Sequence, residues 1–194
     1  MEGNPRNAAV WSHGFVLIGS RDAEIPQSGA PFGPEWETVG FLSGDEGFTE
    51  SVDVETNDHF AWGGVLLATT KSNFKLTKNF TALEQNKVIE DLVFPGNTVE
   101  YDDIGGHEGM IVVPELQDEF RIAFVNRSGS RRVGRTEKRF VSAGYAMIDD
   151  RGDAQDSETE LASRELTVAF YGDEADEDGN QNLIYKWAGP IDGS

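Results

Sequence analysis

The stretch Glu119-Phe120-Arg121-Ile122-Ala123-Phe124 decides the fold class, because its apolar side chains fall at every second position. Strict alternation of this kind predicts a β-strand with one packed face and one face toward water or another subunit. The same period recurs at 165–171, 73–80 and 48–55. Further strands are expected at 10–18, 36–43, 60–69, 109–113, 138–148 and 182–188.

A single helix is expected beside these strands. Thr81-Ala82-Leu83-Glu84 has the spacing of a capping box, and the apolar residues Val88, Ile89 and Leu92 follow it. Pro95-Gly96 then predicts an end to the helix. We therefore expect a mainly β fold, a β-sandwich or half-barrel, with one flanking α-helix at about 82–92.

The 194 residues are predicted to form one domain over 1–194, with an N-terminal arm (1–9), a basic loop (127–139) and an acidic loop (149–160). The chain has no cysteine, which excludes a disulfide scaffold and thiolate chemistry. No run approaches the roughly 20 apolar residues that span a bilayer, and the first residues lack the pattern of a signal peptide. We expect folding in a reducing cytosol, without a membrane partner.

The net charge of −19 predicts repulsion from DNA phosphates and anionic membranes. The basic loop is the exception, because its arginines and lysine face a single carboxylate, Glu137. Three interpretations of this loop stay open: a nucleic-acid patch, a solvated hairpin tip, or a loop that docks on the acidic surface of another copy. The last makes sense for an acidic molecule with one basic protrusion. Its arginines are Arg127, Arg131, Arg132 and Arg135, with Arg139 beyond them.

Motifs that carry chemistry are missing from the sequence. His13, His59 and His107 lie far apart, and none has the spacing of a zinc-binding helix. There is neither a phosphate-binding glycine loop followed by Lys-Ser/Thr nor a Gly-x-Ser-x-Gly nucleophile turn. We therefore expect no enzyme activity, no catalytic residue, no cofactor and no metal site.

Three stretches, together spanning about 35–92, resemble a known family. Residues 35–50 (EWETVGFLSGDEGFTE), 58–64 (DHFAWGG) and 74–87 (FKLTKNFTALEQNK) follow one another in the family's order and spacing. In these phrases the chain is similar to the major tail tube proteins of long-tailed, non-contractile phages, especially those of actinobacterial hosts.

The resemblance implies a structural role in the virion, after assembly in the host cytoplasm. Six subunits would form a ring, and stacked rings would enclose the tape measure protein and later conduct double-stranded DNA without binding it specifically. Tail terminator and baseplate proteins would be further partners. An acidic inner wall would keep the DNA mobile, and the lumen-lining candidates are Thr49, Ser51, Asp53 and Glu55, opposite Phe48, Val52 and Val54.

Contacts between subunits or rings are expected from the N-terminal arm (Asn4, Pro5 and Arg6) and from the basic loop. Two alternatives remain: another ring-forming virion protein, such as a tail terminator or baseplate hub, and a soluble β-sandwich that binds glycans. The second would stack sugars on Trp11, Trp36, Trp62 or Trp187.

Overall fold

The computed structural model describes residues 11–190 except 46, 97, 102–106, 112–117, 131–133, 154–161, 174–178 and 180. Only the backbone is described for 98–101, 107–111, 129–130 and 134–135. The elements are β1 (His13–Ser20), β2 (Trp36–Thr38), β3 (Thr49–Phe60), β4 (Leu66–Ala82), α1 (Lys87–Val93), β5 (Thr98–Tyr101), β6 (His107–Ile111), β7 (Phe120–Ser130), β8 (Gly134–Ser142), β9 (Tyr145–Arg151), β10 (Arg164–Tyr171) and β11 (Ile184–Pro190). The mainly β fold with one helix is confirmed for the described part of the chain.

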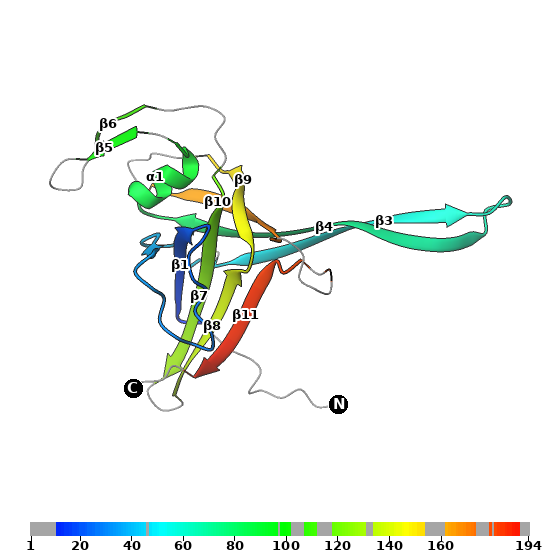
Figure 1. Cartoon of the computed structure of the whole chain (residues 1–194), viewed down its shortest axis with the longest axis horizontal. Coiled ribbons are helices and arrows are strands. Elements are labelled where there is room, and N and C mark those ends of the chain that lie inside the picture. The colour runs from blue at the N-terminus through cyan, green and yellow to red at the C-terminus, as the bar shows by residue number, and fades with distance from the viewer. Residues whose placement is uncertain are drawn as a thin grey trace.

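Nine strands form one open antiparallel sheet in the order β11-β8-β7-β9-β10-β4-β3, with β1 and β2 added beside β7. Strands β7 and β9 pair at Phe120 and Ala146 alone. The sheet turns over at this joint, so that β1, β7, β8 and β11 face β9, β10, β4 and the first part of β3 (Figure 1). Strands β5 and β6 form a separate hairpin.

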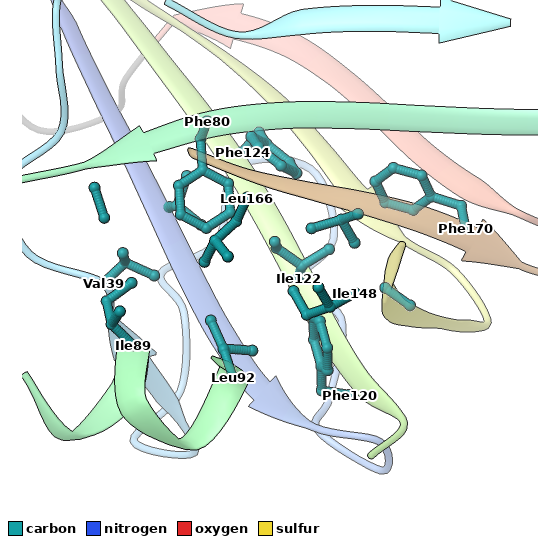
Figure 2. Close-up of a cluster of buried hydrophobic side chains, with 14 of the residues drawn as sticks. Val39, Phe80, Ile89, Leu92, Phe120, Ile122, Phe124, Ile148, Leu166 and Phe170 are labelled. Carbon is teal, nitrogen blue, oxygen red and sulfur yellow. The ribbon is translucent and has the colours of Figure 1, made fainter. Parts of the chain in front are cut away.

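The core lies between these two layers (Figure 2). Phe124 of β7 is its centre, and the rings of Phe80, Phe140 and Phe170 surround it at centroid distances of 5.9–6.5 Å. Ile89 and Leu92 of α1 close one end of the core. The alternating apolar residues that predicted β7 therefore face this core, and the residues between them lie on the opposite face of the strand.

A second, smaller cluster packs on the outer face of β7 and β8. Ala23, which follows β1, and Trp36, the first residue of β2, cover this face and pack with Ala123 and Val141. The indole N–H of Trp36 donates to the backbone oxygen of Glu24 at 3.0 Å. The outer face of β7 and β8 is therefore covered at Ala123 and Val141 and is not accessible to a partner there.

The predicted helix start is wrong. Strand β4 continues through Ala82, and α1 begins at Lys87 with Asn86 as its N-cap. The Asn86 side chain accepts from the Ile89 backbone N–H at 3.1 Å. The Thr81–Glu84 pattern has the right spacing for a cap, but pairing with β10 holds Thr81 in the sheet.

Several strand boundaries also differ from the prediction. The 60–69 segment contains a hairpin turn between β3 and β4, and 138–148 contains the turn between β8 and β9. Only 36–38 of the predicted strand 36–43 is a strand, with a single bridge at Leu42. The predicted acidic loop starts inside β9, which includes Asp149 and Asp150, and its residues 154–160 lie outside the described part.

Candidate assembly surface

The β3–β4 hairpin projects from the body as an arm, here defined as residues 49–75 (Figure 1). All twelve residues of β3 are exposed, and on β4 the first buried residue is Leu76. At about 3.3 Å per residue, β3 is about 40 Å long. The sequence predicted three separate short strands here, at 48–55, 60–69 and 73–80, and gave no sign of the projection.

The tip of the arm is apolar. Ala61 N–H donates to the Val65 carbonyl at 2.8 Å, and Gly63 and Gly64 take the positive φ values, 96° and 81°, that this turn requires. Trp62 is fully exposed, and Phe60 and Leu67 are 60% and 69% exposed. A tight glycine turn thus holds a cluster of large apolar side chains away from the body of the molecule.

One face of the arm is apolar nearer the body as well. Val52 lies opposite Leu76 and Val54 opposite Phe74, so the four side chains share a face. Leu76 enters the core, whereas Val54 and Phe74 remain 42% and 57% exposed. The pairs Thr56–Lys71 and Asp58–Thr69 separate this apolar patch from the tip. Exposed apolar patches are typical of interaction sites.

The opposite face of the arm is polar and carries the lumen-lining candidates. Thr49, Ser51 and Asp53 pair with Asn79, Thr77 and Lys75 respectively. After a bulge at Asn73, Glu55 stays on this face, where it accepts from the Asn73 amide at 2.6 Å. The predicted division between the polar row and Val52 and Val54 is confirmed, although Phe48 precedes β3 and packs against Phe124.

The polar face continues from the arm across the body. Thr49, Asn79, Thr167 and Asp150 are successive register partners on β3, β4, β10 and β9. The next row, Ser51, Thr77, Ala169 and Met147, is polar on β3 and β4 and apolar on β10 and β9. The carboxylates that these strands present on this side are Asp53, Glu55, Asp149, Asp150 and Glu165, and Lys75 is bound to Asp149 at 2.7 Å.

The root of the arm is fixed by an ion cluster on its other side. Lys78 is 7% exposed, and its ammonium lies 3.7 Å from Glu50 and over the rings of Phe124 and Phe140. Glu50 also accepts from Lys186 of β11 at 2.8 Å, which joins β3 to the far edge of the sheet. Burial lowers the pKa of Lys78. Burial alone would raise the pKa of Glu50, but the Lys186 hydrogen bond and the surrounding lysine charges bring it below 4.5.

The basic loop is a strand hairpin rather than an irregular loop. Arg127 and Glu137 are opposite each other on β7 and β8 and are joined at 2.6 Å. Glu137 and Arg139 are buried and bonded to each other, and Arg139 donates to the Ala30 carbonyl at 2.5 Å. Arg127 and Arg139 therefore both help to hold the hairpin in place, and the buried Arg139 is not accessible to a partner.

Several predicted contact residues lie outside the described part of the structure. They are Asn4, Pro5 and Arg6 of the N-terminal arm and Arg131 and Arg132 of the hairpin, while Arg135 is described by its backbone alone. Arg127 is exposed, and its guanidinium lies 5.0 Å from the centroid of the Phe15 ring.

The four tryptophans do not form a common platform. Trp36 is buried, and the Trp187 ring packs close to Gly29 and under the Arg139 guanidinium. Trp11 is half-buried, and Trp62 is alone at the tip of the arm. The described residues therefore do not form a row of tryptophans that could bind a sugar.

No family model matches the chain, and no curated protein matches it. The described residues include no group of three or more His, Asp and Glu side chains placed to hold a metal ion. Among them there is also no helix with the length and apolar character needed to cross a bilayer.

Proposed function

We propose that the chain is a structural subunit that assembles with copies of itself into a tube, the tail tube of a long-tailed, non-contractile phage. The observation that carries the proposal is the two-sided arm. Its apolar face and tip are exposed without a cover, and its polar face continues over four strands of the body. When copies join, the apolar face and tip of each arm would be buried, and the polar faces of neighbouring copies would line up.

The open sheet supports this proposal. Strands β3 and β11 are the two ends of the strand order, and β3 offers a long unpaired edge. Such an edge invites pairing with another chain, and closing strands into a barrel is a way to remove it. A ring of copies, six by the resemblance, would bring β3 of one copy beside the sheet of the next and convert these edges into interfaces.

The polar face suits the inner wall of such a tube. It carries carboxylates and small hydroxyl side chains, with its lysine already bound to Asp149. Contacts between phosphates and cationic side chains release counterions and create affinity. A wall dominated by Asp53, Glu55 and Glu165 would repel the duplex and let DNA pass, after the tape measure protein has left the bore.

The experiment compares two charge insertions on the same arm. The variant with Val54→Asp and Phe74→Asp removes the apolar pair, whereas Asn57→Asp adds a carboxylate to the polar face. We expect both to stay folded, and we expect only wild-type protein and Asn57→Asp to form tubes in negative-stain micrographs at high concentration. Tubes from the double variant would contradict the role of the arm.

Single closed rings without tubes would favour the second candidate, a tail terminator or baseplate-hub ring. Wild-type protein that stays monomeric when the tape measure protein and assembly chaperones are supplied would contradict both. A monomer that binds glycans would point to the sugar-binding alternative. A triple Glu substitution at Arg131, Arg132 and Arg135 tests the docking hypothesis for the basic hairpin, which predicts folded monomers that form no tubes.

A further inference from the structure

A cavity of about 620 Å³ opens between α1, the end of β1 and the start of β7. Its floor is apolar and includes Val88, Leu92 and Phe120. Charged side chains line it as well. Carboxylates, among them Glu35, Glu37 and Asp91, which are exposed, outnumber the arginines Arg21 and Arg151, and Arg21 is paired with Glu119. An apolar floor below hydrogen-bond acceptors suits a flat apolar group with a donor at its edge.

The indole ring of tryptophan has these properties. It has a large apolar body and a single N–H donor, which needs an acceptor when the ring is buried. Leu92 and Phe120 would contact the ring, and a rim carboxylate would accept the N–H. Burial raises the pKa of Asp91, consistent with a partly desolvated rim.

The chain carries one matching group on the arm. Trp62 is fully exposed at the tip, and the tip and the whole of β4 lie within residues 59–83, which contain no Asp or Glu and three lysines. In a chain with net charge −19, most other surface would be repelled by the acidic rim of the cavity. Strand β3 carries Asp53, Glu55 and Asp58, but the tip itself, residues 59–71, has no carboxylate and can approach the cavity without this repulsion.

We propose that the Trp62 indole of one copy enters the cavity beside α1 of the next copy. The inference rests on the proposed self-assembly and assigns the surface that receives the arm. The arm extends to one side of the body, and α1 and the start of β7 lie on the other side (Figure 1). Contacts between two different surfaces at opposite sides are heterologous, so they propagate from copy to copy.

The first test maps where the tip lies in the assembly. Full-length protein with the photoreactive side chain p-benzoylphenylalanine at position 62 is assembled, irradiated and digested, and the linked peptides are identified by mass spectrometry. Links to residues 18–21, 88–95 or 118–120 of a second copy are expected. Tubes with links elsewhere would overturn this inference and leave the proposed function standing, whereas absence of assembly by the wild-type chain would overturn both.

A second test changes the cavity. Val88→Glu puts a carboxylate into the apolar floor, and Lys87→Glu adds one beside it on the same helix at an exposed position outside the cavity lining. We expect Val88→Glu to raise the concentration needed for assembly about 30-fold or more, as for loss of an aromatic anchor, and Lys87→Glu to leave it within about threefold. Equal effects of the two would overturn the inference, and the cross-linking result decides if Val88→Glu does not fold.

Discussion

Replacing Glu50 with glutamine is expected to loosen the root of the arm. The Glu50 carboxylate lies 3.7 Å from the ammonium of Lys78, whose side chain is 8% exposed, and also binds Lys186. Breaking a fully buried ion pair costs about 3–5 kcal/mol, and an exposed pair contributes about 0–1 kcal/mol. Because the Glu50 side chain is 31% exposed, we expect an intermediate loss of about 2 kcal/mol in the free energy of unfolding.

The measurement is urea unfolding at pH 7 of wild type, Glu50→Gln and Glu55→Gln. Glu55 is on the same strand but is exposed and far from the lysine cluster, so its change should stay within about 0.5 kcal/mol. Since the folded pKa of Glu50 is lowered, its contribution is present above pH 4.5 and is lost as the pH falls through the folded pKa. The difference between wild type and Glu50→Gln should therefore close in acid.

A second substitution separates the charge from the packing. Lys78→Met in the Glu50→Gln background removes the unpaired buried charge and keeps an apolar chain over Phe124 and Phe140. It should restore most of the lost stability. Equal unfolding free energies for Glu50→Gln and Glu55→Gln at pH 7, or no recovery with Lys78→Met, would refute the reasoning about the ion cluster.

Three further substitutions test the cap, the core and the polar face. Asn86→Ala removes the N-cap acceptor of α1 and should cost about 1 kcal/mol, or about 2–4 °C in Tm by calorimetry; no change would contradict the cap. Phe124→Ala should cost about 3–5 kcal/mol in urea unfolding because its ring is at the centre of the core; a loss below about 1 kcal/mol would contradict that position. Asp53→Lys with Glu55→Lys should permit tube growth but slow genome delivery in an infection assay, and unchanged delivery would remove both residues from the lining.

The strand pattern could be predicted from the sequence where one face of a strand enters the core. Phe120, Ile122 and Phe124 alternate on β7 because the intervening residues face the other side of the sheet. The helix start was missed because Thr81 and Glu84 have the spacing of a cap while register pairing holds Thr81 in β4. The spacing of residues in the sequence does not show whether Thr81 belongs to the strand or to the helix, because its partner Glu165 is distant in sequence.

The candidate surface was predictable only in part. Alternation placed Asp53 and Glu55 opposite Val52 and Val54, and this division is correct. Alternation does not tell whether anything covers the apolar side, so the exposure of Val54 and Phe74 could not be predicted. The cavity beside α1 was also out of reach, because its floor and rim come from segments that are distant in sequence.

A cryo-electron microscopy reconstruction of the assembled wild-type chain tests the central claim most directly. The account predicts a hollow tube in which Thr49, Ser51, Asp53 and Glu55 of every copy face the bore, with the apolar face of each arm buried against a neighbouring copy. An assembly without a bore, or a bore lined mainly by lysine and arginine side chains, would contradict it.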